Sequence, residues 1–133
     1  MSGRQLAFVG SSGDGNTITA IAVGPGDRLE VLATLPGPPS PSFALVGPAG
    51  RLHVTSEVEA GRVHSYAFAV ESGQVRLRPV GEAPSGGSHP CHLGVDRTGR
   101  WVAVANYRDG SVAVHDAGGD ALSGPVAVAT PTG

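Results

Sequence analysis

The sequence is poor in several residue types, and each shortage excludes a class of protein. Its 133 residues include no lysine, one cysteine (Cys91), three Phe, two Tyr and one Trp. A single cysteine cannot close a disulfide within the chain, which excludes a disulfide-stapled scaffold. No apolar run approaches the roughly 20 residues of a membrane-spanning helix, and the N-terminal segment lacks the features of a signal peptide. We therefore expect a cytoplasmic protein without a membrane partner.

Positive charge is also scarce and scattered. The nine basic residues are all arginines, spread from Arg4 to Arg108, and the formal net charge is −2. Nucleic-acid-binding domains carry a basic stripe or patch that meets the phosphate backbone. The sequence has no such cluster, so we expect no nucleic-acid partner.

Glycine and proline are abundant instead, with 21 Gly and 11 Pro among 40% hydrophobic residues. They alternate with short runs rich in Val, Ala and Leu. This pattern is typical of short strands joined by tight turns rather than of helices or disorder. The composition therefore predicts an all-β protein.

An internal repeat sets the architecture. Segment 41–63 aligns without a gap with segment 90–112, which places Pro41 on Pro90 at an offset of 49 residues. At this offset Glu57 aligns with Asn106. Four strands per unit and a period of about 40 to 50 residues are typical of a β-propeller blade.

The repeat divides the chain into an incomplete first blade (1–40), a second blade (41–88) and a third blade (89–133). We expect strands at 5–10, 17–23 and 28–34, then at 42–46, 51–56, 63–69 and 74–80, and finally at 91–95, 101–106, 111–115 and 125–129. The fold class is thus a partial propeller of about two and three-quarter four-stranded antiparallel blades, in which the first blade lacks its innermost strand. Period-2 alternation places Leu29, Val31, Ala33 and Leu35 on one face, and Val63, Ser65, Ala67 and Ala69 on another.

Several polar side chains should meet at one rim of this fold. In an antiparallel meander the first strand of a blade starts where the second strand ends. Residues at these points are expected on the same rim, and they are Ser11, Glu57, His89, His92, Asn106, Tyr107 and Arg108.

The most specific motifs resemble a known family. Segment 85–114 contains His-Pro-Cys-His at 89–92 and Ala-Asn-Tyr at 105–107, and it is similar to the lactonase family of bacterial 6-phosphogluconolactonase and fungal carboxymuconate cyclase. Segment 41–57 resembles the preceding blade of that family, which ends in a similar Asn-Glu pair, with Ser56 here in place of the Asn.

The resemblance implies a seven-bladed propeller that hydrolyses a lactone, a cyclic ester, with a small-molecule or sugar-phosphate substrate and without a metal or other cofactor. It implies catalytic roles for Glu57, His89 and His92, and substrate binding by Asn106 and Tyr107. Lactone opening needs a base for water and donors for the oxyanion. Arg108 could bind a phosphate group of the substrate. Ser11 lies on the first blade at roughly the same height as these residues. Seven such units need roughly 340 residues, so we expect the chain to be a fragment of a longer enzyme.

Other interpretations stay open. The histidines at the start of the third blade could be packed or capping residues, and Asn106 with Tyr107 could close a turn. The pair His89 and His92 suggests zinc, but no further ligand completes a site, so we predict no metal. A noncatalytic repeat module that associates through exposed blade faces, with a protein partner or a second copy, is the main alternative function. A muconate-type lactonising cyclase is another.

Overall fold

The fold consists of antiparallel strands in three sheets. The computed structural model describes residues 5–13, 15–119 and 121–131, and these residues form three sheets of three, four and four strands. The first sheet contains β1 (Gln5–Ser11), β2 (Thr17–Val23) and β3 (Leu29–Pro36). The second contains β4 (Pro41–Gly47), β5 (Arg51–Ser56), β6 (Arg62–Glu71) and β7 (Gln74–Pro84). The third contains β8 (Pro90–Val95), β9 (Trp101–Asn106), β10 (Ser111–Asp116) and β11 (Pro125–Ala129).

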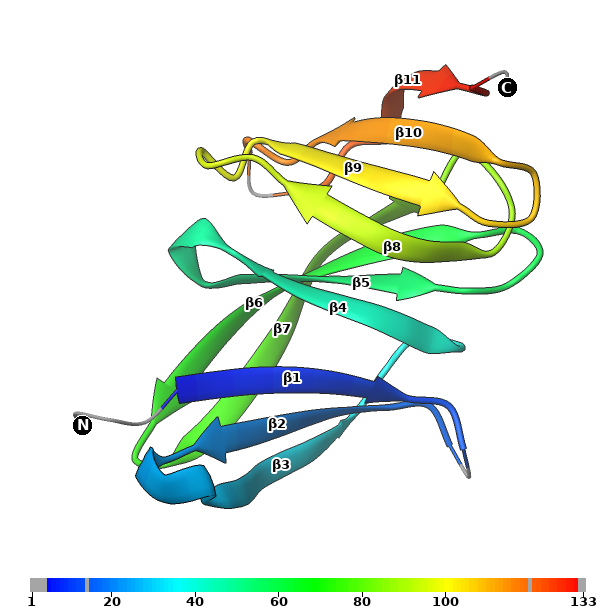
Figure 1. Cartoon of the computed structure of the whole chain (residues 1–133). Coiled ribbons are helices and arrows are strands. Elements are labelled where there is room, and N and C mark those ends of the chain that lie inside the picture. Colours follow the sequence, from blue (N-terminus) through cyan, green and yellow to red (C-terminus); the bar gives the residue numbers. More distant parts are fainter. Residues whose placement is uncertain (1–4, 14, 120, 132–133) are drawn as a thin grey trace.

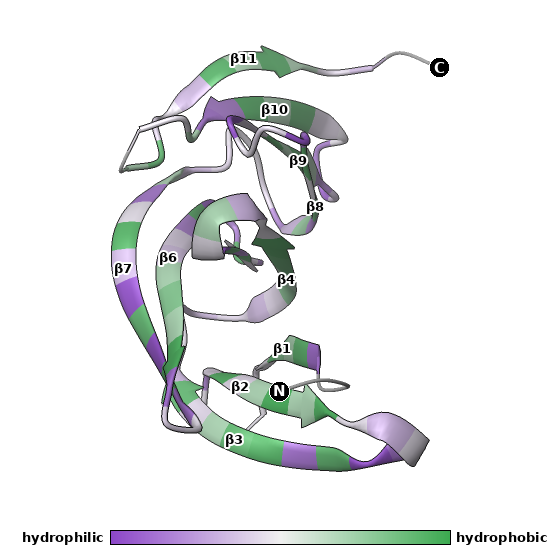
Figure 2. Cartoon of the chain, turned by 90° about the vertical axis from the view of Figure 1, so that its left-hand side faces the viewer, coloured by the Kyte–Doolittle hydropathy of each residue, from purple (hydrophilic) through white to green (hydrophobic). Residues whose placement is uncertain are grey.

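Each sheet is a meander in chain order, and the three sheets lie one above the other (Figures 1 and 2). The inner strand β4 of the second sheet contacts both β1 and β8, and β3 contacts β7 on the far side. Wedge-like sheets that meet along one line of inner strands are the blades of a propeller. The predicted fold class, an all-β partial propeller, is confirmed. Two single helical turns, η1 (Pro25–Asp27) and η2 (Pro48–Gly50), are additions that the sequence pattern did not predict.

The first sheet lacks the strand that the other two place innermost. The amide of Gly37 donates to the carbonyl of Asn16, just as the amide of Ser85 donates to the carbonyl of Gly61. By this correspondence β2 and β3 match β6 and β7, so β1 matches the second strand β5. Gly10 of β1 lies so close to the Pro41 backbone that a Cβ there would collide with it.

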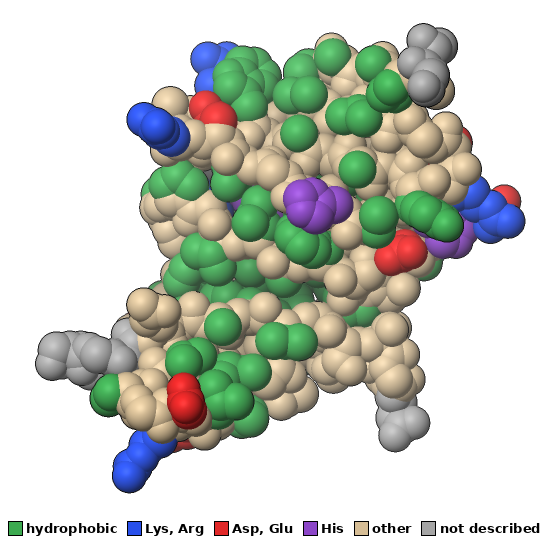
Figure 3. Space-filling view, in the orientation of Figure 1, with side chains coloured by type: hydrophobic (Ala, Val, Ile, Leu, Met, Phe, Trp, Pro, Cys, Tyr) green, Lys and Arg blue, Asp and Glu red, His purple; other side chains and the backbone are tan. Residues whose placement is uncertain are grey.

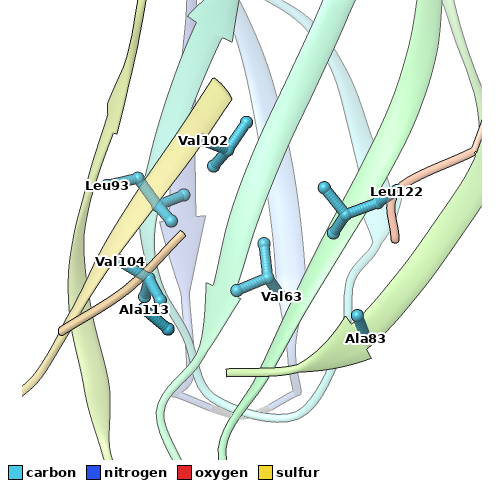
Figure 4. Close-up of a cluster of buried hydrophobic side chains, with 7 residues drawn as sticks. All are labelled: Val63, Ala83, Leu93, Val102, Val104, Ala113 and Leu122. Atoms are coloured by element: carbon cyan, nitrogen blue, oxygen red, sulfur yellow. The ribbon is translucent and has the colours of Figure 1, made fainter. Parts of the chain in front are cut away.

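Two clusters of buried side chains hold the sheets together. The cluster between the second and third sheets is shown in Figure 4 and consists of Val63, Ala83, Leu93, Val102, Val104, Ala113 and Leu122. The cluster between the first and second sheets consists of Ile18, Leu52, Val54 and Tyr66, and beside it the rings of Phe8 and Phe68 meet edge to face at 5.1 Å. These positions follow the period-2 alternation of the strands, which directs every second side chain to the same neighbour.

The expected alternation along β3 is wrong beyond its first residues. A bulge shifts the pairing of β2 with β3, so that Ile21 lies opposite Val31 while Ala20 lies opposite Ala33. A bulge adds one residue to a strand and thereby moves the following side chains to the other face. Leu29 and Val31 are therefore exposed at 70% and 62%, whereas Ala33 turns to the side of the buried Ala20.

The offset of 49 also fails within β5 and β9. Pro41 lies opposite Ser56, whereas Pro90 lies opposite Asn106. Since the two prolines correspond, Ser56 and Asn106 occupy the same position. Glu57 therefore corresponds to the residue after Asn106, and the prediction that it corresponds to Asn106 is wrong.

Two differences in turn length cause this shift and then cancel it. The turn from β4 to β5 is η2, which has three residues. The turn from β8 to β9 is one residue longer: residues 97–100 lie between Asp96, whose amide donates, and Trp101, whose carbonyl accepts. The next loop reverses the difference, because residues 57–61 follow β5 while only residues 107–110 follow β9. A gapless alignment of the two segments therefore matches the residues before and after this strand correctly. It misaligns only β5 and β9, by one residue.

Candidate active site

The predicted site residues lie along one edge of the three sheets. β1, β5 and β9 end at this edge, and β4 and β8 begin there, at the right of Figure 1. We call it the loop edge; its described residues are 12–13, 15–16, 37–40, 57–61, 85–89 and 107–110. The meander brings these loops together because each strand reverses the direction of the one before it.

Backbone hydrogen bonds fasten three of these loops to one another. The amide of His89 donates to the carbonyl of Val58 at 2.9 Å, and the amide of Tyr107 donates to the carbonyl of His89 at 2.9 Å. The amide of Arg108 donates to the carbonyl of Ser88 at 3.2 Å. The backbone at His89 thus connects the loop of Glu57 on the second sheet with Tyr107 and Arg108 on the third.

His89 has an unusual backbone conformation. Its φ is +55°, in the left-handed region, and its ring Nδ1 lies 2.9 Å from Ser88 Oγ. Ser40, which precedes Pro41 as His89 precedes Pro90, has a φ of +47°. Non-glycine residues adopt this conformation only where surrounding contacts hold it. The turn before each inner strand, β4 or β8, is therefore held in one conformation. On the third sheet the residue at this turn is a histidine, His89.

Glu57 and Tyr107 are equivalent residues of neighbouring sheets. The amide of Glu57 donates to the carbonyl of Ser40 at 2.9 Å, the same bond that Tyr107 makes to His89. Glu57 is half-buried, whereas the ring of Tyr107 is 78% exposed. The two residues occupy equivalent positions of neighbouring repeats, and Tyr107 and the loop of Glu57 both bond to the backbone of His89.

His92 lies on β8, and its exposed ring is stacked on Phe43 with centroids 4.6 Å apart. A bulge at Cys91 separates it from Pro90, as a bulge at Ser42 separates Phe43 from Pro41. His92 therefore occupies the position that Phe43 has in the second sheet, where Phe43 packs against the apolar cluster. The third sheet exposes an imidazole where the second packs a phenyl ring.

Asn106 is not at the surface of the loop edge. It is 2% exposed, and its amide nitrogen donates to the carbonyl of Ser85 at 3.0 Å and to Ser111 Oγ at 3.1 Å. Its buried Oδ1 accepts no hydrogen bond from the described residues. The Asn106 side chain thus holds loop 85–89 against the start of β10 and, through it, the backbone of His89.

Ser11 ends β1 opposite Thr17, as Ser56 and Asn106 end their strands opposite the first residue of the next. It is exposed, whereas Ser56 and Asn106 are buried. The structure therefore places Ser11 at the same height as these two residues, on the first sheet.

Comparison with known proteins identifies the family. The family model described as lactonase, 7-bladed beta-propeller, matches residues 7–131. The chain belongs to this lactonase family. A search of the curated proteins gave no significant match.

Solved structures are similar over nearly the whole chain. A candidate 6-phosphogluconolactonase from Bacteroides fragilis is 23% identical with a TM-score of 0.85, and the match covers 99% of this chain and 38% of that one. The periplasmic gluconolactonase of Pseudomonas aeruginosa is 26% identical with a TM-score of 0.79, over 96% of this chain and 38% of that one. A candidate 6-phosphogluconolactonase from Bacteroides uniformis is 24% identical with a TM-score of 0.74, over 92% and 34%. The chain thus spans little more than a third of the length of these lactonase-like structures.

Two residues that the sequence pattern did not single out also belong to the loop edge. Ser88 contacts the His89 ring and Ser40 accepts the Glu57 amide through its carbonyl. The signal for both was present, because Ser40 directly precedes Pro41 and Ser88 lies one residue before the equivalent His89-Pro90 pair. Asp109 is a third, since it accepts from Ser111 Oγ at 2.9 Å, and this bond lowers its pKa.

Three hollows on the surface of the described residues lie away from these side chains. They have volumes of about 930, 360 and 400 Å³ and are lined by residues of η1 and β3, by the η2 and 98–99 turns, and by β6 and β7. On the face that Figure 3 shows, the basic side chains lie near its margins. Within the described ranges, no group of three or more His, Cys, Asp or Glu side chains is arranged to hold a metal ion. The same ranges contain no helix that is long and apolar enough to cross a membrane.

Proposed function

We propose that the chain carries part of the active site of a lactonase of the 6-phosphogluconolactonase type, at the loop edge. The observation that supports this most directly is that Glu57 and Tyr107 are equivalent residues, and that Tyr107 and the loop of Glu57 both bond to the backbone of His89. The family match over residues 7–131 and the gluconolactonase-type neighbours support the reaction class.

Hydrolysis of a lactone adds water across the ring ester. A base removes a proton from water while its oxygen attacks the carbonyl carbon, and the C–O bond of the ring then breaks to give a carboxylate and a hydroxyl group. The proton that the base took is returned to the leaving alkoxide. A positioned general base contributes about 10²- to 10⁴-fold to such a step.

We assign the base to Glu57 or His89. Both lie at turns fixed by backbone hydrogen bonds, and neither is fully buried. The Ser88 hydroxyl beside Nδ1 orients the His89 ring. The exposed His92 is a further catalytic candidate.

Substrate contacts fall to the exposed side chains of the same edge. The Tyr107 hydroxyl can donate to the developing oxyanion, and the Arg108 guanidinium can form charge-assisted bonds to a phosphate. Ser11 can donate to a sugar hydroxyl from the first sheet. Asn106, which is buried, acts by holding the His89 loop rather than by touching substrate. A cytoplasmic location stays a prediction.

A hydrolysis assay with two substrates tests this proposal. Purified protein is given 6-phosphogluconolactone or unphosphorylated gluconolactone, and acid release is followed at constant pH against spontaneous hydrolysis. Glu57→Gln and His89→Asn should each lower the rate, and the variant that removes the base should lower it by about 10²-fold or more. Glu59→Gln is the matched control, since Glu59 is an exposed carboxylate in the same loop.

Arg108→Gln separates the two substrates. It should raise KM for the phosphorylated lactone and leave that for gluconolactone unchanged, if the guanidinium meets the phosphate. Equal rates for wild type and the Glu57 and His89 variants would refute the assignment of the site. No hydrolysis of either lactone above the spontaneous rate would refute the proposed activity of the chain.

A further inference from the structure

Loop 85–89, which carries His89, is held between the second and third sheets by its backbone. On the side of the second sheet, the amide of His89 donates to the carbonyl of Val58 at 2.9 Å. On the side of the third sheet, the carbonyl of Ser88 accepts from the amide of Arg108 at 3.2 Å. The position of the His89 ring therefore depends on how this loop packs.

Gly87 packs the loop against three polar residues around the start of β10. A Cβ on Gly87 would lie 2.7 Å from Asp109 Oδ2 and 2.8 Å from Asn106 Cβ, and it would overlap Ser111 Oγ. These distances are far below the roughly 3.5–4.0 Å of ordinary contact between heavy atoms. A side chain at position 87 would therefore push the loop away from these three residues.

Asp109 contacts this loop with one of its carboxylate oxygens. Its Oδ1 accepts from Ser111 Oγ at 2.9 Å and from the Ser111 amide at 3.3 Å, as aspartates in turns often do with the residue two places on. Its Oδ2 lies beside Gly87. The Ser111 hydroxyl lowers the pKa of Asp109 most, and the amides of Ser111 and Ser88 lower it further. The carboxylate thus holds both the start of β10 and the backbone at Ser88.

The second sheet holds its equivalent loop with fewer parts. Loop 37–40 is one residue shorter than loop 85–89. Ser56, at the position of Asn106, closes it by donating its hydroxyl to the carbonyl of Pro39. The longer loop with a glycine and a carboxylate is therefore not needed to close the repeat, and it occurs on the sheet that has a histidine at this turn.

We propose that Asp109 and Gly87 are positioning residues for His89, which they hold through Ser88 without touching substrate. The Ser88 hydroxyl lies 2.9 Å from Nδ1 of the His89 ring, so a displaced Ser88 backbone displaces the imidazole. The role of the two residues in catalysis rests on the proposed function, in which His89 is a candidate base. Catalytic groups must be held within about 0.5 Å of the productive geometry, and a misplacement of about 1 Å can cost about 10²-fold in rate.

The His89 ring and amide give the first test, which needs no substrate. In Asp109→Ala the ring signals of His89 in ¹H–¹⁵N spectra should shift; they are assigned by their loss in His89→Asn. Hydrogen exchange of the His89 amide, which bonds to Val58, should become about tenfold faster or more, because exchange reports local opening. Ring signals and exchange that match the wild type would overturn the proposal.

Asp96→Ala is the matched control. Asp96 also bonds to the residues that follow it, with Thr98 Oγ at 2.7 Å and the Trp101 amide at 3.0 Å. Its turn lies at the opposite edge of the same sheet, between β8 and β9. This variant should leave the ring signals and the amide exchange of His89 unchanged.

Gly87→Ala tests the packing of the loop. It should change the same His89 signals as Asp109→Ala, whereas Gly124→Ala should not, because a Cβ on Gly124 meets no described atom within 4 Å. Circular dichroism first establishes that each variant keeps its β-sheet signal. If Gly87→Ala loses that signal, Asp109→Ala decides alone, since Asp109 is exposed and its removal leaves the core intact.

Lactone hydrolysis gives the second test. Asp109→Ala should lower kcat by about tenfold or more and change KM by less than about twofold, because the base is misplaced while the substrate contacts stay. Asp109→Asn, which keeps one acceptor oxygen, should lose less. A lower kcat with unchanged His89 signals would overturn the proposal, because Asp109 would then act on substrate directly. If the wild type hydrolyses no lactone, the proposed function fails, and the His89 signals still decide whether Asp109 and Gly87 hold the ring.

Discussion

Acid should weaken the packing between the second and third sheets, because two histidines are buried there. His53 on β5 is 1% exposed, with Nδ1 2.7 Å from Ser65 Oγ. His115 on β10 is 0% exposed, with Nδ1 3.0 Å from the carbonyl of Ser123. Burial, the Arg51 guanidinium and the His115 imidazole together lower the pKa of His53 from 6.5 to about 4. Burial also lowers the pKa of His115.

The magnitude and the sign follow from linkage. Unfolded chains take up a proton at His53 near pH 6.5, whereas the folded chain takes it up only near pH 4. Between these values the unfolded state binds more protons, so the free energy of unfolding falls as the pH falls. At ~1.4 kcal/mol for each pH unit, His53 alone removes about 3 kcal/mol by pH 4. The loss begins below pH 6.5 and is complete below pH 4.

Urea unfolding at a series of pH values measures this effect. The free energy of unfolding of the wild type should fall steeply between about pH 6.5 and 4. In His53→Gln the total fall over this window should be smaller by about 3 kcal/mol, which is the share of His53. The slope is the quantity to compare, since an amide in place of a ring also changes packing at neutral pH. An equal slope in both proteins over this window would refute the reasoning.

Carboxylates contribute only at the acid end of this window, because unfolded Asp side chains begin to take up protons below about pH 5. The Trp101 backbone amide lowers the pKa of Asp96, and the Arg100 side chain lowers the pKa of Asp116, both from 3.8. A carboxylate with a lowered pKa stabilises the fold above its unfolded value and loses that contribution as the pH falls through its folded value. The part of the window from about pH 6.5 to 5 therefore reports on the histidines.

Two further predictions concern the supports of the loop edge and the core. Asn106→Ala should lower the free energy of unfolding by about 1–3 kcal/mol, because it removes two buried hydrogen bonds and leaves the Ser85 carbonyl without its amide donor, and an unchanged urea midpoint would contradict this. Leu93→Ala should cost about 2–5 kcal/mol by opening a cavity in the cluster of Figure 4, measured in the same way, whereas Val126→Ala on the exposed strand β11 should change stability by less than about 0.5 kcal/mol.

The strands could be predicted from the sequence because local and tertiary signals agree there. Gly and Pro mark the turns, and the buried faces require alternating apolar residues, as at Leu52 and Val54 or Val102 and Val104. Bulges give no comparable signal. The bulge that turns Ala33 inward depends on how β3 pairs with β2, and a strand pattern read alone continues through it.

The correspondence between blades was harder to predict than the blades themselves. One added residue before β9 and one fewer after it leave the outer parts of the repeat aligned. The apolar pattern contained the correction, since a shift of one residue matches Leu52 to Val102 and Val54 to Val104, all buried. The family resemblance gave the same one-residue correction. The strand in the family ends in an Asn-Glu pair that matches Ser56 and Glu57, so Ser56, not Glu57, aligns with Asn106.

The loop edge was predictable as a place, but the environment of each side chain was not. Strand direction alone brings Glu57, His89 and Tyr107 to one edge, and the hydrogen bonds through His89 do so in the structure. Whether a side chain there is buried depends on the packing of neighbouring loops. Asn106 points inward to Ser85 and Ser111 while the adjacent Tyr107 is 78% exposed.

Comparison of equivalent positions separates packing residues from candidates for chemistry. One position that packs on a neighbouring sheet holds a β-branched apolar residue in each repeat: Ile18 and Val63 are buried there, and Val112 is their equivalent on the third sheet. The position after Ser11, Ser56 and Asn106 instead changes from Ser12 to Glu57 to Tyr107. The repeated hydrogen bond at that position in the second and third sheets is made by the backbone amide, which every residue except proline supplies. The fold thus fixes where these side chains stand and leaves their chemistry free, which is the arrangement that a catalytic pocket shared among blades requires.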